Sequence, residues 1–588
     1  QDNCLEILRD TKKLNPEVRK YLEEENAYTK ENMKDTENLQ KKIFKEIEGR
    51  IKLDDESLPF IDKNYEYWTK TTKEGNYSKK LRKKIGSDKV ECYFDGDIEA
   101  KGKKFFSTGD LVVSNNDEFL AYSIDDKGGE YFTIFVRRIA DNKIIEKIED
   151  TAGGIVWSYD DKSFFYRKHD SQKRPRQILQ HKLGSPIKED ILIFEEQDER
   201  FTCSIDTTSC EKFYMIETSE HTTSETYYFH KDEKKFEPKL FLKREDGILY
   251  SMDSFDGYWY MHTNKEAEDF KILKCSNDKI NDWKDFVPAK SGTLIGGLTF
   301  LKKWIIRSEI SNALSKILVR SVETGNEEEL IFTDEKVISP GVSLIRKDKN
   351  TDLIRVGYES PKTPNRIFEY NIQTKEKKIV KEQIVPSGHN RDDYVVERLT
   401  CESHDGQKIP MTVTYHKKTK IDGSAHVLLY GYGSYGSSMW PAFSTSKFSL
   451  IDRNIIWVTC HIRGGLEKGM AWWREGKMLN KKNTFSDFIS CAKFLIKKKY
   501  TTEKKIIAYG GSAGGLLVGA VLNEEPDLFL GAINAVGFLE PLQTNLRHEL
   551  PLTKGEFKEF GDAKNNKEHF RARKRRWRSK NPDKAAVI

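Results

Sequence analysis

The residues best suited to chemistry in this chain lie in AYGGSAGG (508–515), where Ser512 is the centre of a Gly-x-Ser-x-Gly pattern. The flanking residues, KKII before it and LLVGAVL after it, predict a strand that turns sharply into a helix. Such a turn lifts the hydroxyl of Ser512 clear of the backbone as a candidate nucleophile. It also points the N–H of Ala513 at the oxyanion that develops. Glycine-rich strand–helix turns bind phosphates as well, so the pattern alone leaves that alternative open.

A second glycine-rich segment, YGYGSYG (430–436), follows the hydrophobic strand HVLL. A loop at the carboxyl end of a strand is placed to offer a second hydrogen bond to an oxyanion. An ordinary turn is the alternative explanation of the same glycines.

The elements around both segments predict a parallel sheet that is covered by helices. From about residue 395 the pattern predicts paired strands (ERLTCES and PMTVTYHKK), another strand and loop (RNIIWVTCHIRGG) and an amphipathic helix (NTFSDFISCAKFLIKKK). Strands that alternate with helices are typical of an α/β domain. We therefore expect residues 393–588 to form the unit that carries Ser512.

Residues 63–392 show a different pattern, in which short strands are separated by Gly, Asp, Asn and Ser. Their aromatic or aliphatic cores recur every 45 to 50 residues, at FLAY (119–122), FFYR (164–167), FYMI (213–216), YWYM (258–261), WIIR (304–307) and IRVG (354–357). This period, with several strands per repeat, is typical of β-propeller blades. NYEYWTKT (64–71) predicts a seventh blade. A β-rich domain with chance spacing is the alternative.

The segment before the repeats predicts helix. Residues 15–50 are rich in Glu, Lys and Leu, with apolar residues three and four apart and a proline near the start. We assign residues 1–62 to an N-terminal helical extension.

The composition excludes several classes of protein. No window approaches the roughly 18 consecutive apolar residues of a membrane span. The first residues, QDNCLEILRDTKK, lack the basic-then-apolar pattern of a signal peptide. The eight cysteines are dispersed, with no CxxC motif and no Cys/His group at metal-ligand spacing. We expect reduced thiols in a cytoplasmic protein, with no metal, no cofactor and no membrane partner.

The net charge of +6 comes from one short segment. RARKRRWRSK (571–580) holds seven basic residues and no acidic one, and the rest of the chain has 93 basic against 94 acidic residues. Such a patch is able to bind nucleic acid, but a single Trp577 makes no base-stacking platform. We interpret residues 571–588 as an anomalous, solvated tail and expect no nucleic-acid partner.

The chain resembles the prolyl oligopeptidase family of serine peptidases in four ordered segments: HVLLYGYGSYG, HIRGGLEKGMAWWREGK, KKNTFSDF and YGGSAGGLLVGAVLNEEPDLF. PLTKGEFKEFG, RKHDSQKRPRQILQHKLG and the N-terminal DNCLEILRD resemble its oligopeptidase B branch most. The resemblance extends from residue 1 to about residue 570. It implies a seven-bladed β-propeller that caps an α/β-hydrolase domain, with N-terminal helices packed on the hydrolase.

The resemblance also implies roles for individual residues. Ser512 matches the nucleophile, and the N–H of Ala513 and the side chain of Tyr432 match the oxyanion hole. Glu556, in GEFKEF, matches an acidic residue that binds a basic side chain at P1. The second acidic position of that site is Lys558 in this chain.

Two further assignments around the P1 site have alternatives. Phe538, in AVGFLEP, is placed to stack on the same cation, although an ordinary core aromatic explains it too. Glu556 itself also fits a charged surface loop. Two positions tied to P2 preference in the branch fall on Trp440 and Ala442, so the P2 preference stays open.

The catalytic Asp and His of the family have no counterpart in this sequence. They follow the GEFxEFG segment in the family, whereas the histidines after Ser512 are His548 and His569, which do not match. Past Phe570 the composition changes abruptly to RARKRRWRSKNPDKAAVI. We therefore expect a hydrolase domain that stops early, and a polypeptide that is inactive and poorly soluble.

The leading hypothesis is a cytoplasmic serine oligopeptidase, monomeric or dimeric, that cleaves short peptides after Arg or Lys. The propeller would restrict entry to short peptides. A non-catalytic propeller and pseudohydrolase that binds peptides or proteins is the second hypothesis, favoured by the missing Asp and His. A hydrolase of esters or lipids is the third, and the GEFKEF segment weighs against it.

Overall fold

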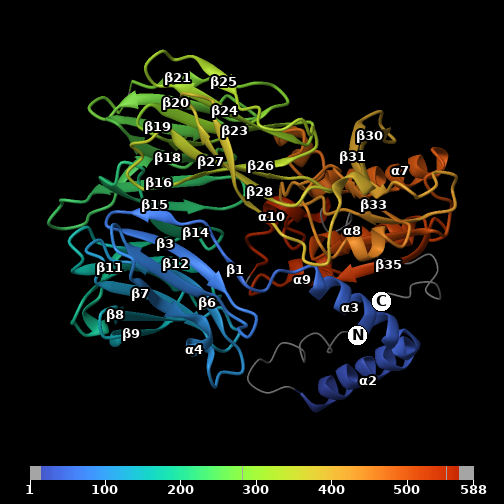
Figure 1. Cartoon of the computed structure of the whole chain (residues 1–588), viewed down its shortest axis with the longest axis horizontal. Coiled ribbons are helices and arrows are strands. Elements are labelled where there is room, and N and C mark those ends of the chain that lie inside the picture. Colours follow the sequence, from blue (N-terminus) through green and yellow to red (C-terminus); the bar gives the residue numbers. More distant parts are fainter. Residues whose placement is uncertain (1–14, 281, 551, 569–588) are drawn as a thin grey trace.

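Two units of regular structure make up the chain, a ring of small β-sheets and a larger sheet that is covered by helices (Figure 1). This computed structural model describes residues 15–280, 282–550 and 552–568. The basic segment 571–588 lies outside the described residues, and its interpretation as a solvated tail stays a prediction.

Seven antiparallel sheets form the ring in the described part of the chain, the first with five strands and the others with four. The six repeated cores all lie in the second strand of their sheets, and the predicted seventh blade is the first sheet. The propeller prediction is therefore confirmed. The first sheet already includes β1 (Asp55–Glu56) and β2 (Phe60–Asp62), on the N-terminal side of residue 63.

The strands of the first four blades are β1 (Asp55–Glu56), β2 (Phe60–Asp62), β3 (Tyr65–Thr71), β4 (Lys79–Lys84) and β5 (Val90–Asp95); β6 (Ser107–Val113), β7 (Phe119–Asp125), β8 (Phe132–Arg138) and β9 (Lys143–Thr151); β10 (Val156–Trp157), β11 (Ser163–His169), β12 (Pro175–Lys182) and β13 (Ile191–Glu195); β14 (Thr202–Thr207), β15 (Phe213–Ser219), β16 (Ser224–His230) and β17 (Lys239–Leu242). The last three blades comprise β18 (Tyr250–Phe255), β19 (Tyr258–Thr263), β20 (Lys271–Ser276) and β21 (Lys284–Val287); β22 (Leu294–Phe300), β23 (Trp304–Ser311), β24 (Leu314–Ser321) and β25 (Glu327–Glu329); β26 (Ser339–Leu344), β27 (Leu353–Glu359), β28 (Arg366–Asn371) and β29 (Lys377–Glu382). A short helix, α4 (Gly96–Ala100), links the first two blades, and a 3₁₀ turn at Ile187–Glu189 precedes β13.

Apolar contacts between neighbouring blades close the ring. Ile134 of the second blade packs in one buried cluster with Trp157 and Phe164 of the third. Phe165, the next residue along β11, packs in a separate cluster with Ile205 of the fourth blade. Successive residues of a strand point to opposite faces, so each blade has an apolar face toward each neighbour. Burying both faces requires a blade on either side.

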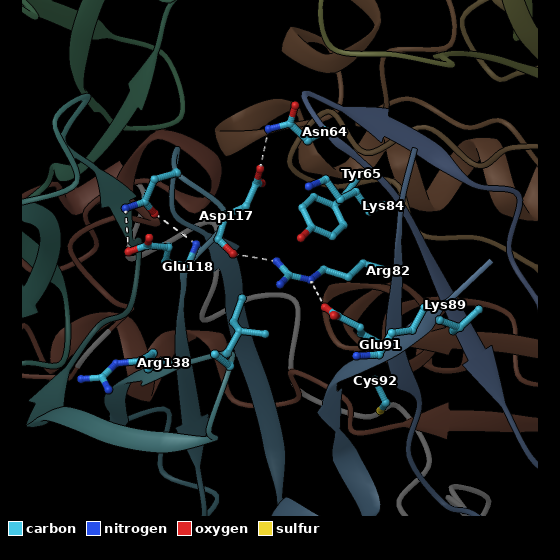
Figure 2. Close-up of a pocket in the computed structure, with 14 residues that line it drawn as sticks. Asn64, Tyr65, Arg82, Lys84, Lys89, Glu91, Cys92, Asp117, Glu118 and Arg138 are labelled. Carbon is cyan, nitrogen blue, oxygen red and sulfur yellow. Dashed lines mark hydrogen bonds and ion pairs between the residues drawn. The ribbon is translucent and has the colours of Figure 1, made fainter. Parts of the chain in front are cut away.

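A polar groove of about 780 Å³ lies between the first two blades (Figure 2). Arg82 crosses it, with Nε donating to Glu91 Oε2 at 3.0 Å and Nη1 donating to the carbonyl oxygen of Asp117 at 2.8 Å. Asn64 donates to the Asp117 carboxylate at 3.2 Å. The charge of Arg82 is thus balanced by Glu91, and the contact of Arg82 with Asp117 joins the two blades.

The second unit is a six-stranded sheet in the order β30-β31-β33-β32-β34-β35. The strand β31 is antiparallel to both of its neighbours, β30 and β33, and the last four strands in this order are parallel. This confirms the predicted paired strands followed by a parallel sheet. Its strands are β30 (Tyr394–Glu402), β31 (Lys408–His416), β32 (His426–Tyr430), β33 (Ile455–Cys460), β34 (Ile506–Gly511) and β35 (Phe529–Ala535).

Two helices, α7 (Lys481–Lys497) and α8 (Ala513–Glu524), bury their apolar faces in the main core of this unit. Phe488 of α7 and Leu517 of α8 pack there with strand residues such as Val427 and Val458. The shorter helices are α5 (Phe448–Ile451), α6 (Met470–Arg474), α9 (Pro541–Leu546) and α10 (Phe557–Phe560), and 3₁₀ turns lie at Arg391–Asp393 and Met478–Asn480.

The N-terminal residues are helical, as predicted, but in two helices. A 3₁₀ turn at Lys34–Thr36 separates α2 (Pro16–Met33) from α3 (Glu37–Gly49). The α3 helix lies on the second unit, where Glu46 accepts two hydrogen bonds of 2.8 Å from Arg453. In the described ranges, no helix combines the length and the apolar character that crossing a bilayer requires.

A buried ion pair fixes the loop after β33 to α7. Arg463 and Asp487 are both fully buried, and Arg463 donates from Nε and Nη2 to the two carboxylate oxygens, at 2.9 and 2.6 Å. Ser403 Oγ also donates to Asp487 at 2.6 Å. Burial alone would lower the pKa of Arg463, but hydrogen bonds to Asp487 and Asp405 raise it above its ordinary value.

We expect Asp487→Ala to destabilise the second unit by about 3–5 kcal/mol, since it leaves the guanidinium of Arg463 buried without its main partner. Native-state hydrogen exchange of peptides that cover β32 and β33 measures the free energy of unfolding of this unit separately from the propeller.

The matched control is Lys493→Ala, on the same helix. Lys493 pairs with Glu525 at 2.7 Å, but their side chains are 55% and 42% exposed. Its effect is expected to stay within about 1 kcal/mol. Equal effects of the two substitutions would show that the buried pair does not hold this loop.

Candidate active site

The turn from β34 to α8 holds Ser512 in a strained backbone conformation, with φ +53° and ψ −119°. Such a conformation costs a non-glycine residue of the order of 1–3 kcal/mol and persists only where the surroundings impose it. Here Ser512 N–H donates to the carbonyl oxygen of Ala535 at 2.9 Å, and its own carbonyl oxygen accepts from Phe538 N–H at 2.9 Å. The predicted sharp turn is therefore present, and β35 and the loop after it hold it in place.

The glycines around Ser512 are required by close backbone contacts. A Cβ at Gly510 would lie 2.3 Å from the carbonyl oxygen of Gly514, and one at Gly515 would lie 2.4 Å from the Cα of Gly537. A side chain at either position would push the turn apart. These contacts explain the spacing of GGSAGG without a phosphate.

The YGYGSYG loop lies beside this turn, because β32 and β34 are parallel neighbours and end at the same edge of the sheet. A Cβ at Gly514 would lie 2.9 Å from the carbonyl oxygen of Gly431 and 3.2 Å from the ring of Tyr432. Burial raises the pKa of Tyr432, and a hydrogen bond with Ser512 opposes that effect. Tyr432 and Ala513 thus lie on either side of the candidate nucleophile.

Three packed rings, Phe538, Phe560 and Tyr435, join Ser512 to Glu556 and are termed the aromatic cluster. Phe538, bonded through its N–H to Ser512, packs on Phe560 with ring centroids 5.5 Å apart. Phe560 in turn packs edge-on against Tyr435 at 5.6 Å, and the Tyr435 hydroxyl donates to Glu556 Oε1 at 3.0 Å. All five residues singled out in the sequence therefore belong to one connected group.

Tyr435 belongs to the aromatic cluster, although it was not predicted from the sequence. Burial raises the pKa of its hydroxyl, as does the neighbouring carboxylate of Glu556. Its φ is +57°, a left-handed conformation that is uncommon for a bulky residue. The one sequence signal is its position between two glycines of YGYGSYG.

Lys558 contacts the propeller. Its ammonium group lies 2.7 and 3.0 Å from the two carboxylate oxygens of Asp246, in the propeller. This hydrogen bond holds the pKa of Asp246 below its usual range. The basic residue at the second acidic position of the branch therefore makes an ion pair between the two units.

A buried ion pair between Lys481 and Glu559 holds the YGYGSYG loop. It was not predicted from the sequence. Lys481 donates to the carbonyl oxygen of Gly433 at 2.6 Å and to Ser434 Oγ at 2.5 Å, and it lies 3.3 Å from Glu559 Oε1. Trp473 Nε1–H donates to the other oxygen of Glu559 at 2.8 Å. Both charged side chains are almost fully buried. The sequence did offer one signal: GEFKEF contains two acids, Glu556 and Glu559, and only Glu556 was matched to a role in the family.

The propeller also reaches this site. The ring of His221, in the turn between β15 and β16, lies 5.4 Å from the ring of Tyr435, at an angle of 31°. His221 is thus a propeller residue that contacts the aromatic cluster, and no motif in the sequence marks it.

No histidine among the described residues makes a hydrogen bond with Ser512. His548 lies 3.3 Å from Asp562 and packs on Phe557, and His569 lies outside the described residues. Within the same described ranges, no group of three or more His, Cys, Asp and Glu side chains is arranged to hold a metal ion. The geometry at Ser512 thus offers a candidate nucleophile and candidate oxyanion donors, with no base among the described histidines.

Family comparisons match both units. The family model described as "Prolyl oligopeptidase, N-terminal beta-propeller domain" matches residues 5–383, and the model "Prolyl oligopeptidase family" matches residues 441–584. Dipeptidyl aminopeptidase BI from Pseudoxanthomonas mexicana is 33% identical over 94% of this chain and 79% of its own length. Protease 2 from Moraxella lacunata is 31% identical over 95% of this chain and 81% of its own length.

Solved structures match the whole arrangement. Oligopeptidase B from Leishmania major superposes with a TM-score of 0.91 at 29% identity, over 97% of this chain and 82% of that one. Oligopeptidase B from Trypanosoma brucei, with covalently bound antipain in a closed form, gives 0.92 at 29% identity over the same shares. The relatives are longer than this chain, which spans about four-fifths of their length.

We expect Lys481→Met to destabilise the second unit by about 3–5 kcal/mol, because it leaves Glu559 buried without a cation. Glu559→Gln alone should cost a similar amount. The double substitution should cost less than the sum of the two, by about 0.5–3 kcal/mol, because it removes both charges of the pair. Hydrogen exchange of peptides covering β32 measures all three. Strict additivity would contradict the ion pair.

Proposed function

The chain belongs to the prolyl oligopeptidase family of serine peptidases, and from that premise we propose that it cleaves short peptides after Arg or Lys through an acyl-enzyme on Ser512. In this reaction the Ser512 Oγ attacks the peptide carbonyl carbon and the hydroxyl proton passes to a general base. The base passes this proton to the leaving nitrogen as the tetrahedral intermediate collapses, so that the amine departs. Water then hydrolyses the resulting ester, which releases the acid and restores the Ser512 hydroxyl. No described histidine contacts Ser512, so we assign the base to none of them.

The oxyanion of the tetrahedral intermediate would lie between two donors. The N–H of Ala513, the first residue of α8, follows the nucleophile directly, and the hydroxyl of Tyr432 faces Ser512 from the neighbouring loop. Donors already in place where charge develops stabilise the transition state more than the substrate. Losing one such donor typically lowers kcat by about 10²–10³-fold.

The observation that carries the P1 assignment is the Glu556 carboxylate beside the aromatic cluster. Tyr435 holds one of its oxygens, and Phe538 and Phe560 provide flat apolar surfaces between it and Ser512. An Arg or Lys side chain would place its alkyl chain on these rings and its charge on Glu556. Charge-assisted hydrogen bonds of this kind contribute roughly 1.5–3 kcal/mol.

The propeller supports a preference for short peptides, because it lies beside the hydrolase unit (Figure 1) and contacts Tyr435 of the aromatic cluster with His221. The seven described cysteines are free thiols, and on that basis we propose a reducing, cytoplasmic setting.

A second function, peptide binding without catalysis, is favoured by the lack of a described histidine at Ser512. Reaction with a fluorophosphonate separates the two, because the probe needs an activated serine.

We expect a fluorophosphonate probe to label the 588-residue protein at Ser512 and Ser512→Ala to abolish the labelling. Without a base from the described histidines, the rate should be at least about 100-fold below that of Leishmania major oligopeptidase B measured in parallel. A complete lack of labelling would contradict the peptidase proposal in favour of the binding protein. A rate equal to that of the reference enzyme would show that Ser512 is fully activated.

The P1 preference is tested by binding. In a Ser512→Ala background, calorimetry should show that a peptide ending in Arg binds about 10- to 100-fold more tightly than the same peptide ending in citrulline, which is uncharged but has almost the same shape.

Glu556→Gln should remove this difference, and Lys558→Gln, two residues away and directed at Asp246, should preserve it. A preference for Arg that survives Glu556→Gln would place the P1 cation elsewhere.

A further inference from the structure

The segment between β33 and the end of α6, residues 461–474, contacts three parts of the molecule and is termed the connector. It touches the propeller on one side, and the YGYGSYG loop and α10 on the other. Its sequence, HIRGGLEKGMAWWR, has glycines at the points of closest approach.

Asp269 is a buried propeller residue that contacts the connector. It lies between β19 and β20 and is 7% exposed. One carboxylate oxygen accepts from Met470 N–H at 2.8 Å, and the other accepts from Gly292 N–H, in its own domain, also at 2.8 Å. A Cβ at Gly469 would lie 2.2 Å from the first of these oxygens. The glycine and the buried carboxylate thus fit each other across the boundary between the two units.

A second contact from the propeller is made by backbone. Ala313, at the tip of the β23–β24 hairpin, donates its N–H to the carbonyl oxygen of Glu467 at 2.6 Å. Ala313 is 2% exposed and has a φ of +57°. The two anchors hold the connector at Glu467 and Met470, three residues apart.

On its other side the connector packs directly on the loop that carries Tyr432. A Cβ at Gly464 would lie 1.9 Å from the carbonyl oxygen of Gly433, and the Gly464 carbonyl oxygen accepts from Gly436 N–H at 2.9 Å. Glu467 Oε1 accepts from Met439 N–H at 2.9 Å. Because the two segments are in direct backbone contact, a displacement of the connector would also displace the YGYGSYG loop.

The same segment reaches the proposed P1 region through α6. Trp473 donates a hydrogen bond to the buried Glu559 of α10. Glu556 is the residue directly before the first residue of α10. Trp472 returns to the connector, where its carbonyl oxygen accepts from Gly464 N–H at 3.0 Å. Met470, which Asp269 holds, is the first residue of this helix.

We propose that Asp269 is a positioning residue for the reaction at Ser512. The proposal rests on the function proposed above. Through Met470 and the connector, Asp269 holds the loop of Tyr432 and the segment of Glu556 in their relative positions. Asp269 does not touch the substrate or Ser512, and its effect is transmitted by backbone packing.

Hydrogen exchange tests this on the full-length protein without requiring activity. Asp269→Ala should speed exchange roughly 10- to 100-fold in peptides covering the connector and, as the decisive readout, in those covering residues 430–440. Peptides from the core of α8 should be unchanged. Faster exchange confined to the connector, or spread evenly over the chain, would overturn the proposal.

Glu268→Ala is the matched control. Glu268 is the adjacent residue and also contacts the connector, pairing with Arg474, but the two side chains are 46% and 59% exposed. Such a pair contributes little, so exchange should change by less than about 2-fold. Asp269→Asn retains one acceptor oxygen for Met470 N–H. It should give a smaller change in the same two peptides, and it serves as the test if Asp269→Ala does not fold.

A kinetic readout links the contact to the reaction. The rate of fluorophosphonate labelling at Ser512 should fall at least about 10-fold in Asp269→Ala and stay the same in Glu268→Ala. If the unsubstituted protein does not label, the proposed function fails while hydrogen exchange still decides the inference. If exchange at 430–440 and labelling are both unchanged in Asp269→Ala, the positioning role is wrong.

Discussion

The site depends on backbone packed against backbone around Ser512. The serine is held in a left-handed conformation because β35 and the loop after it bond to both its N–H and its carbonyl oxygen. The space around it is filled by the main chain of the GGSAGG turn, the YGYGSYG loop and the connector. A Cβ would collide with main-chain atoms at Gly510, Gly464 and Gly476. Glycine is needed at these positions because nothing larger fits, and each loop thereby fixes the place of the next.

The charged groups divide into two classes with different consequences. Within the hydrolase unit the pairs are buried: Arg463 with Asp487 and Lys481 with Glu559 hold loops to α7 and α10. Between the units, several pairs are exposed, such as Lys558 with Asp246 and Arg474 with Glu268. Breaking a buried pair costs several kcal/mol, whereas an exposed pair contributes about 1 kcal/mol or less. These pairs between the units therefore contribute less than the buried pairs of the hydrolase unit, and buried Asp269 stands out among the contacts between the units.

Patterns with a physical period were readable from the sequence. The strand cores recur because each blade repeats one packing problem, and GGSAGG marks a turn that only small residues allow. Lys558 could be recognised as a departure from the branch, but its partner Asp246 is more than 300 residues away in the chain. Asp269, His221 and Lys481 were not found for the same reason. Each of these residues contacts partners that are distant in the sequence. A single buried Asp or Lys produces no periodic pattern, and it cannot be distinguished from the other charged residues, which make up one-third of the sequence.

Ser512, its proposed oxyanion donors and Glu556 are proposed to form one site for a peptide with a basic P1 residue. A crystal structure of the protein with a peptidyl-arginine boronic acid tests this most directly, because boron bonded to the serine oxygen stands in for the tetrahedral carbon. We expect a bond from Ser512 Oγ to boron and a boronate oxygen within hydrogen-bonding distance of Ala513 N–H and the Tyr432 hydroxyl. We also expect the guanidinium to contact the Glu556 carboxylate. An adduct whose guanidinium points away from Glu556, or whose boronate oxygen contacts neither donor, would contradict it.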